Sequence, residues 1–347
     1  MTSEPPPPTA EPELRPVLSS DLHTNGVATT AGGRMFLPVQ PRPGSDDPQV
    51  VEVRDGTPVP FPDAAWNSGG DPARSFVAVN AVRLDPEGRL WIVDRGAPQV
   101  GAEQVPGGAK LVVVDLAGDR VVRVVDLSTA VRERSFVDDV RFNGRMAYLT
   151  DAGTHPALIV LDLETGATRR LLEDHPSVVS QKPLRAEGRE LRDPDGQPVV
   201  INADQLEVSP DGQWFYYQPC CGGMSRIRTH YLDDPTLDPS DVERHVEPFA
   251  DTPSTGGTAM DADGTLYLSD TDRSAVLTIS PDGEMQTLVD DPRLLWVDAM
   301  WIDDDGQLLM PAVQLNRMPD MNGGESAVDP PLTVWGAPLG LRPDRRH

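Results

Sequence analysis

Hydrophobic and polar positions along the chain form a short repeating pattern of two apolar runs joined by an acidic turn. The clearest copy has apolar-rich residues from Val79 to Leu84, a turn from Asp85 to Gly88, and a second apolar run from Leu90 to Val93. Apolar runs on both sides of an Asp/Pro/Gly turn are typical of a β-hairpin. The pattern therefore predicts an antiparallel β protein.

Six copies of this pattern follow one another along the chain. Their first positions are Asn25, Asn80, Asp138, Asp204, Gly256 and Asp298. These starts lie 55, 58, 66, 52 and 42 residues apart, which suits propeller blades of roughly 40–50 residues with loop insertions. Further strand-like runs, such as residues 110–116 and 121–127, lie between the hairpins. We therefore predict an all-β fold, a six-bladed β-propeller.

The repeats also define the expected domain boundaries. We predict one propeller domain over residues 18–340, with a Pro-rich, disordered lead-in at 1–17 and a tail at 341–347. The lead-in has neither a basic nor an apolar stretch, so it does not resemble a signal peptide. The last repeat is short after Met310, so we expect residues 332–335 and the N-terminal segment to be candidates for completing its blade.

Composition and charge narrow the range of partners. The chain of 347 residues has 30 Lys and Arg against 55 Asp and Glu, a net charge of −25 and a pI near 4.5. This acidity argues against nucleic acid as a partner and favours cations and amines. No apolar run approaches the roughly 20 residues of a membrane helix. We expect a cytoplasmic protein that acts on a small-molecule substrate, without nucleic acid or membrane; the sequence leaves protein partners open.

The first position of each repeat is the candidate functional site. If the first apolar run is the innermost strand of its blade, these positions meet at the mouth of the central channel. Five of the six are polar and three are carboxylates, although turn formation alone also favours Asn and Asp. Ligand sites favour hollows with convergent polar groups. We therefore predict that Asp138, Asp204 and Asp298 are catalytic and that Asn25 and Asn80 bind the substrate.

Loops after the second apolar run of each repeat return to the same rim. The further substrate-binding candidates are His155, Cys220, Cys221, Gln314 and, from the long insertion at 173–200, His175. The acidic residues expected at this rim are Asp94, Asp151, Asp270 and Asp272. The two adjacent cysteines lie in a Gly-rich loop, where they could supply a thiolate nucleophile or a soft metal ligand, or could simply pack.

Three carboxylates around one channel repel one another. Either at least one of them has a raised pKa, or a cation lies among them. Oxygen ligands suit Ca²⁺, for which Asn80, Asp138 and Asp204 are the possible ligands. Alternatively, one protonated and one ionised Asp act as general acid and base on a cyclic substrate. The sequence leaves both mechanisms open, and the absence of a nucleotide-binding loop and of a serine-hydrolase elbow gives no reason to expect another cofactor.

Several stretches together resemble a known family. They run from Phe61 to Asn67, Phe76 to Gly96, Asp174 to Pro176, Leu206 to Gln218, Leu315 to Pro319 and Pro330 to Val334. In combination they resemble the yellow / major royal jelly protein family over most of the chain. The resemblance implies a six-bladed propeller. The family includes proteins associated with dopachrome conversion, proteins that bind biogenic amines, and proteins that are not enzymes. The resemblance therefore implies one of these roles and does not choose among them.

A wider similarity is to the senescence marker / gluconolactonase propellers. This similarity implies a divalent metal held by residues that open the first, fourth and fifth blades. Those positions fall here on Asn25, Asp204 and Gly256, of which Gly256 offers no side chain to a metal.

One hypothesis and two alternatives follow from these patterns. The leading hypothesis is tautomerisation or isomerisation of a cyclic, aromatic or amine-bearing metabolite by acid–base chemistry at the channel mouth. The first alternative is a lactone hydrolase that depends on a divalent metal. The second is a protein that binds small molecules, such as amines, without turnover.

Overall fold

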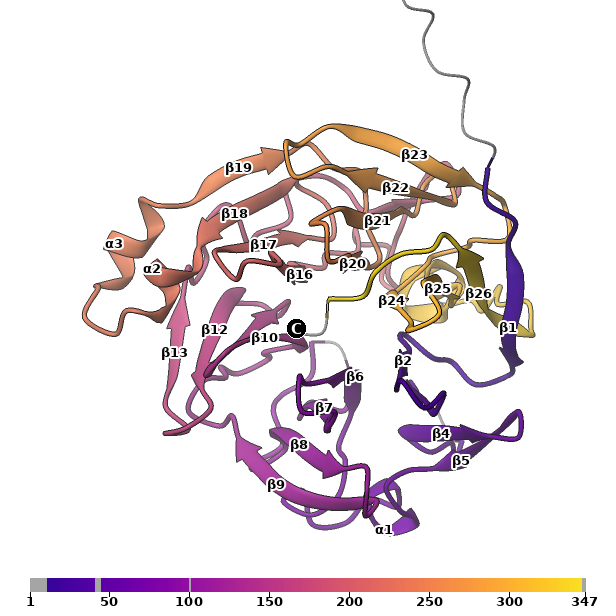
Figure 1. Ribbon diagram of the computed structural model, residues 1–347, viewed down its shortest axis with the longest axis horizontal. Helices are drawn as coiled ribbons and strands as arrows, with labels where there is room; N and C mark the ends of the chain where they lie inside the picture. Colours follow the sequence, from indigo (N-terminus) through magenta and orange to yellow (C-terminus); the bar gives the residue numbers. More distant parts are fainter. Residues whose placement is uncertain (1–10, 41–44, 100, 345–347) are drawn as a thin grey trace, which may run out of the picture.

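The chain folds into six small antiparallel sheets arranged around one axis. The structure is a computed structural model that describes residues 11–40, 45–99 and 101–344. Within these residues, six four-stranded sheets surround the axis as the blades of a propeller (Figure 1). The prediction of an all-β, six-bladed β-propeller is therefore confirmed.

The first three blades are each built from four consecutive strands. The first blade contains β2 (Ala28–Thr29), β3 (Met35–Pro38), β4 (Val50–Arg54) and β5 (Thr57–Pro60). The second contains β6 (Val79–Leu84), β7 (Leu90–Arg95), β8 (Ala109–Asp115) and β9 (Arg120–Asp126). The third contains β10 (Val137–Asn143), β11 (Met146–Asp151), β12 (Ala157–Asp162) and β13 (Thr168–Leu171).

The next blades follow the same order after a small hairpin formed by β14 (Arg185–Ala186) and β15 (Arg189–Glu190). The fourth blade contains β16 (Ala203–Val208), β17 (Trp214–Pro219), β18 (Met224–Arg228) and β19 (Glu247–Ala250). The fifth contains β20 (Thr258–Met260), β21 (Leu266–Asp270), β22 (Ala275–Ile279) and β23 (Met285–Asp290). The sixth contains β24 (Trp301–Ile302), β25 (Gln307–Ala312), β26 (Leu332–Pro338) and β1 (Arg15–Ser20).

The N-terminal strand closes the propeller. It pairs antiparallel with β26, from Arg15 opposite Gly336 to Ser20 opposite Leu332. Both segments proposed from the sequence for the last blade are therefore confirmed. The strand begins at Arg15, three residues before the expected start at 18, and residues 1–10 of the expected lead-in lie outside the described residues. At the other end, Leu341 in the expected tail donates its amide to the Gly306 oxygen (3.0 Å).

Helical segments are short. They are α1 (Ala64–Asn67), α2 (Thr229–Asp233), α3 (Pro239–Glu243) and the 3₁₀ turns Leu315–Arg317 and Pro319–Met321. The helices α2 and α3 project from the outer side of the fourth blade (Figure 1). Within the described residues, none of the helices has the length and apolar content needed to cross a bilayer.

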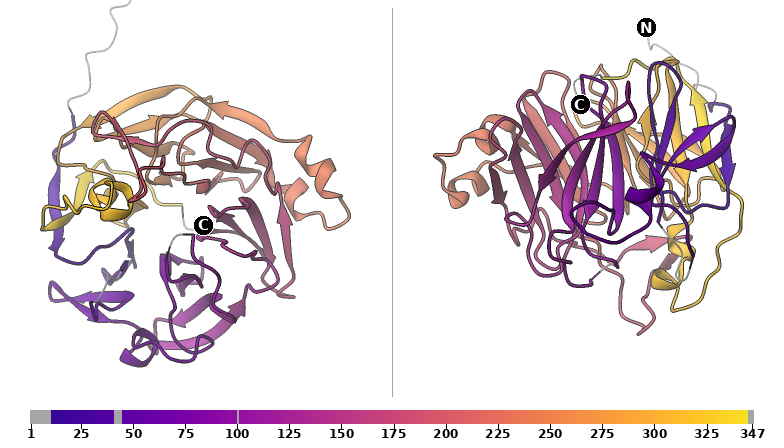
Figure 2. Two further views of the ribbon diagram at one scale, coloured as in Figure 1. Left: turned by 180° about the vertical axis from the view of Figure 1, so that it is seen from behind. Right: turned by 90° about the horizontal axis from the view of Figure 1, so that it is seen from below.

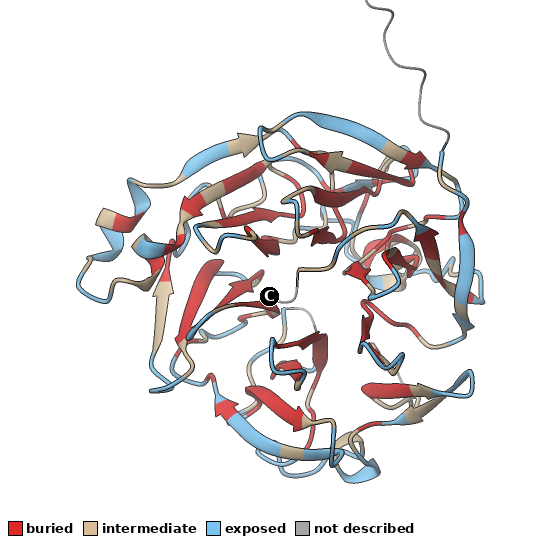
Figure 3. Ribbon diagram, viewed as in Figure 1, coloured by how far each residue is buried: buried red, intermediate tan, exposed pale blue. Residues whose placement is uncertain are grey.

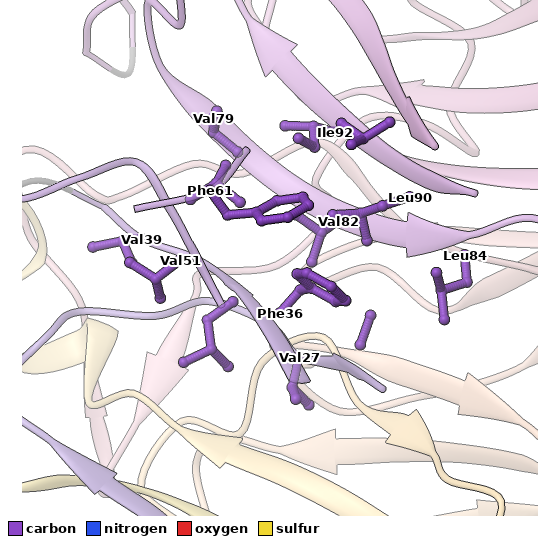
Figure 4. Packing of buried hydrophobic residues seen from close by; sticks show 14 of the residues in the cluster. Val27, Phe36, Val39, Val51, Phe61, Val79, Val82, Leu84, Leu90 and Ile92 are labelled. Atoms are coloured by element: carbon purple, nitrogen blue, oxygen red, sulfur yellow. The ribbon is translucent and has the colours of Figure 1, made fainter. Parts of the chain in front are cut away.

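Buried apolar side chains pack between neighbouring blades. The inner strands are largely buried, whereas the outer strands carry most of the exposed surface (Figure 3). Between the first and second blades, Phe36 and Phe61 lie with ring centroids 4.8 Å apart and pack with Val82 and Leu90 (Figure 4). Close-packed interiors of this kind resist movement. The starts of the six inner strands are therefore held in fixed positions around the axis.

The long insertion before the fourth blade packs on one face of the propeller. Figure 2 shows its hairpin and the 3₁₀ turns on the face opposite to the C-terminal tail. Glu187 forms an ion pair with Arg317 (2.6 Å), and Arg185 forms one with Asp272 (3.1 Å). The insertion is therefore tied to loops of the fifth and sixth blades. We call this side the insertion face.

Candidate functional site

Three of the predicted site residues lie at β-bulges of the innermost strands. The pairing register shifts at Asn80 in β6, at Asp138 in β10 and at Asp204 in β16. A bulge takes a residue out of the hydrogen-bond ladder and turns its side chain in a new direction. These three side chains can therefore meet at the axis instead of alternating along their strands.

Hydrogen bonds join the predicted residues into an arc across four blades. Asn25 Nδ2 donates to the backbone oxygen (2.7 Å) and to Oδ1 (3.3 Å) of Asn80. Asn80 Nδ2 donates to Asp138 Oδ1 (2.6 Å). Asp138 is in turn hydrogen-bonded to Asp204. Four of the five residues proposed from the repeat are thus in one chain of contacts.

Asp298, the fifth residue, lies beside this arc and closes it into a ring. Gly26 and Ala299 form a parallel bridge between the first and sixth blades, which places Asp298 next to the residue that opens the first blade. On its other side the fifth blade approaches closely, because a Cβ at Gly257 would lie 2.4 Å from the Asp298 carbonyl oxygen. The Ala299 amide donates to Asp298 Oδ1 (2.8 Å). We call these five side chains the polar ring.

The three carboxyl groups of the ring hold protons unusually tightly. Each is partly exposed to solvent, but protein atoms surround it closely. Burial raises the pKa of Asp138 well above its usual range, and the neighbouring carboxylates, Asp204 first, raise it further. Burial raises the pKa of Asp298 in the same way, again with help from the charge of Asp204. At neutral pH the ring therefore retains protons that free Asp side chains release.

Asp204 is the carboxyl group closest to neutral titration. Burial raises its pKa to about 7, while the hydrogen bonds from Cys220 and Asp138 favour the ionised form and limit the rise. Its Oδ2 accepts from Gln205 Nε2 (2.5 Å) and from Cys220 Sγ (3.2 Å). Because the hydrogen bond from Asp138 lowers the pKa of Asp204, Asp138 is the partner that keeps its proton. The two residues therefore form a pair of one acid and one base, which we call the acid pair.

A buried ionic layer lies directly below the polar ring. Arg83 and Arg141 both bond to Asp139 (2.5 and 2.8 Å), and Arg141 also bonds to Glu207 (2.8 Å). Burial would raise the pKa of Asp139, but the two guanidinium groups hold it well below its usual range. Asp139 therefore stays ionised, and its charge helps to raise the pKa of Asp204. A cavity of about 50 Å³ adjoins this layer and is lined in part by Pro343 and Asp344 of the tail.

The rim candidates have other partners. His155 Nδ1 lies 3.1 Å from Asp174, and His175 Nδ1 lies 2.8 Å from the Ser177 hydroxyl. Gln314 exchanges two hydrogen bonds with the backbone of Asp329 (both 2.9 Å). Among the described residues, none of these three side chains is hydrogen-bonded to the ring. The structure therefore places them in loop contacts near the site rather than within the ring.

The cysteine pair is buried, with Cys220 2% and Cys221 1% exposed. Both are free thiols, and only Cys220 bonds to the ring.

The acidic rim is smaller than expected. Asp94 and Asp151 are fully buried and paired with Lys110 (2.5 Å) and Arg170 (2.7 Å), so they stabilise loops and are not part of a charged mouth.

Three further residues lie at the ring. Gln205 bonds to Asp204, and its Nε2 also donates to the Thr255 oxygen (2.8 Å). Arg95 stacks on Phe136 (4.7 Å), and burial lowers its pKa to about 10 against the opposing charges of Asp94 and Asp138. Trp296 is 1% exposed, and its N–H lies near Asp298 without the geometry of a hydrogen bond. Arg95 follows the second apolar run of its repeat, whose loop was expected at the rim, whereas contacts in space reveal Gln205 and Trp296.

The residues present do not match the metal ligands expected from the gluconolactonase similarity. At Gly256 a Cβ would lie 2.6 Å from the Val297 oxygen, so no side chain fits there. For the other candidate set, Asn80 turns its nitrogen toward Asp138, while its Oδ1 faces donors from Gln40 and Arg95 (3.3 and 3.4 Å). In the described ranges, no three His, Cys, Asp or Glu side chains are arranged to hold a metal ion.

Replacing Asp298 with Asn is expected to stabilise the fold, and more so as pH rises. The folded protein holds a proton on Asp298 that the unfolded chain releases from about pH 4. That contribution to stability is complete below pH 4 and is lost as pH rises toward the pKa of the folded state. We expect Asp298→Asn to gain about 0.5–2 kcal/mol at pH 8 and less at pH 5, measured by urea unfolding.

Asp211 provides a control in which the same substitution should change stability in the opposite direction. Burial favours its neutral form, but the Ser209 hydroxyl and the Gln213 amide outweigh burial and lower the pKa of Asp211. Its contribution is present above pH 4 and is lost below it. Asp211→Asn should therefore destabilise the protein at neutral pH. A gain for Asp298→Asn that does not change with pH would contradict the electrostatic explanation.

Comparison with known proteins shows the family of this chain. The sequence profile described as "Major royal jelly protein" matches residues 77–329, which includes four of the five ring residues. Protein yellow of Drosophila subobscura is 33% identical over 73 residues. That alignment covers 21% of this chain and only 13% of the yellow protein.

Solved structures with a similar fold are much more distant in sequence. A gluconolactonase from Xanthomonas campestris is 14% identical, with a TM-score of 0.56 over 95% of this chain and 89% of that chain. A putative gluconolactonase is 12% identical, with a TM-score of 0.59 over 96% and 94%. A luciferin-regenerating enzyme is 10% identical, with a TM-score of 0.58 over 96% and 97%. At these identities the similarity supports the propeller fold and no particular reaction.

Proposed function

The chain belongs to the major royal jelly protein family, and we propose that it is an enzyme that moves protons on a cyclic metabolite. The acid pair carries this proposal. Asp138 holds a proton, Asp204 titrates at about pH 7, the two are hydrogen-bonded, and solvent reaches both. A catalytic acid and base work best when their pKa values lie near the working pH.

The pair suits tautomerisation. Ionised Asp204 takes a proton from a carbon or nitrogen next to a carbonyl group, and Asp138 gives its proton to the carbonyl oxygen. The proton gained by Asp204 then passes to Asp138 through their hydrogen bond. This last transfer restores the starting state, so the reaction needs no oxidant, reductant or co-substrate.

The charge of the ring favours a substrate that carries an amine or another cation. Three carboxyl groups share the ring, and Asp139 adds a fixed negative charge below it. A bound cation would take over the role of the retained protons and lower the pKa of each carboxyl group. Binding of an amine should therefore release protons. The resemblance to proteins associated with dopachrome conversion and with amine binding agrees with this preference.

Lactone hydrolysis is the second candidate, because solved gluconolactonases share the fold. In that case Asp204 would activate water for attack on the lactone carbonyl. Metal analysis of the purified protein tests whether lactone hydrolysis here depends on a divalent metal. A stoichiometric divalent ion that is lost in Asp204→Ala would support it, and a metal-free protein that turns over its substrate would exclude it.

The pH dependence of turnover tests the acid pair. With aminochromes such as dopachrome, followed by absorbance, we expect kcat/KM to rise with a midpoint near pH 7 as Asp204 ionises. It should fall at higher pH when Asp138 loses its proton. Because Asp138 and Asp204 are coupled, each midpoint is a property of the pair and not of a single residue. In Asp138→Asn the high-pH fall should disappear, and the remaining rate should be about 10²-fold lower.

Two results would contradict this proposal. A flat profile between pH 5 and 9 would remove the acid pair from the mechanism. Amine binding by calorimetry, together with no turnover of aminochromes or lactones, would instead support the alternative of a binding protein.

A further inference from the structure

The Cys220 thiol is in direct contact with the base of the acid pair. Its Sγ lies 3.2 Å from Asp204 Oδ2, and the residue is 2% exposed. The backbone fixes this position on both sides: the Cys220 amide donates to the Ile201 oxygen (3.3 Å), and the Thr255 amide donates to the Cys220 oxygen (2.8 Å). The thiol is therefore held against the carboxylate.

We propose that Cys220 is a positioning residue that holds ionised Asp204 in place through its S–H group. This inference rests on the proposed function of the acid pair. It assigns to Cys220 neither a nucleophilic nor a metal-binding role.

The chemistry of the thiol supports this role. Burial, and then the charge of Asp204, raise the pKa of Cys220 well above its usual value of 9.0. The sulfur therefore stays protonated at neutral pH, where it is a poor nucleophile but a hydrogen-bond donor. A donor stabilises an ionised carboxylate more than a neutral one. Apart from Asp138, the side chains among the described residues that donate to the Asp204 carboxylate are Cys220 and Gln205, so losing the thiol removes a substantial share of this support.

Cys221 is a matched control within the same loop. Its Sγ donates to the Lys182 oxygen (2.8 Å) and lies 2.9 Å from the Ser180 hydroxyl. It is as buried as its neighbour. A substitution there removes a buried thiol and loosens the same loop, but it leaves the contact with Asp204 intact.

The experiment compares Cys220→Ala, Cys220→Ser and Cys221→Ala in the full chain. The titration of Asp204 is followed by NMR of protein labelled with ¹³C at the Asp carboxyl carbon, and its signal is assigned with Asp204→Asn. In parallel, the low-pH midpoint of kcat/KM is measured with an aminochrome. Stability in urea is recorded for each variant.

We expect Cys220→Ala to move the Asp204 titration upward by about 0.5–1 pH unit, because the ionised form loses a weak donor. Its base form is then scarcer at low pH, so turnover at pH 6 should fall about threefold to tenfold, following that shift. Cys220→Ser should return the midpoint to the wild-type value or below it, since a hydroxyl is the stronger donor. Cys221→Ala should leave the midpoint unchanged.

The proposal is overturned if Cys220→Ala leaves the Asp204 titration in place, or if Cys221→Ala shifts it equally. The NMR measurement needs no substrate. If Cys220→Ala shifts the Asp204 titration but wild type shows no turnover, the proposed reaction is rejected and the positioning role is kept. If wild type turns over its substrate but Cys220→Ala does not shift the titration, the positioning role is rejected and the proposed reaction is kept.

Discussion

Asp204→Asn is expected to lower kcat by about 10²–10⁴-fold, the range typical for loss of a general base. The amide is nearly the same size as the carboxyl group, and its oxygen still accepts from Gln205 and Cys220. It cannot take up a proton at neutral pH. The change therefore removes the base while leaving the packing around it intact. Steady-state kinetics with the substrate that wild type converts best would measure the effect.

Asp305→Asn is the control for this substitution. Asp305 is an exposed residue in the turn between β24 and β25, on the side where the C-terminal tail packs, so the same chemical change there should leave kcat unaltered. The double variant Asp138→Asn/Asp204→Asn should be little slower than Asp204→Asn alone, because groups that act as a unit are not additive. Retention of more than half of the wild-type rate by Asp204→Asn would remove Asp204 from the mechanism.

The six-fold repeat made the fold and the ring predictable. Each copy carries the same hairpin, so the first positions of the copies must occupy equivalent places around the axis. Asn25, Asn80, Asp138, Asp204 and Asp298 were found in this way without any contact information. The bulges that turn three of them inward have no separate signal, because a bulge changes pairing without changing composition.

The spacing of the repeat also contained information that the sequence interpretation missed. Arg83, Arg141 and Glu207 each lie three residues after a ring position in its own copy, and they meet in the ionic layer. Reading this offset across the copies would have revealed a second layer of charge. Asp139 belongs to it as the additional residue of the bulge in β10.

Other features depend on contacts that no repeat encodes. Asp94 and Asp151 follow second apolar runs and were expected at the rim, but Lys110 and Arg170 neutralise them within the blades. The donor role of Cys220 arises because its loop ends beside β16. Such contacts join strands and loops within one blade, and the repeat pattern gives no means of pairing their side chains.

The ionic layer leads to the largest expected effect on stability. Arg141 is buried between two carboxylates: its side chain is 6% exposed and bonds to Asp139 (2.8 Å) and Glu207 (2.8 and 2.9 Å). Replacing it by Met keeps most of the volume but leaves Glu207 with the Thr258 hydroxyl as its remaining partner (2.8 Å) among the described residues. An uncompensated buried charge destabilises a fold by about 3–5 kcal/mol. Arg141→Met should therefore lower the free energy of unfolding by that amount in urea.

Two further variants test whether the unpaired charge of Glu207 causes the loss of stability in Arg141→Met. Arg273→Met removes an ion pair with Asp290 that is about half exposed, and it should change stability by less than about 1 kcal/mol. In Arg141→Met/Glu207→Gln the unpaired carboxylate is gone, so most of the lost stability should return. If the double variant is as unstable as Arg141→Met, the loss comes from packing. If it recovers, the layer below the ring holds balanced charges, and Asp139 remains the fixed negative charge that keeps the protons of the acid pair in place.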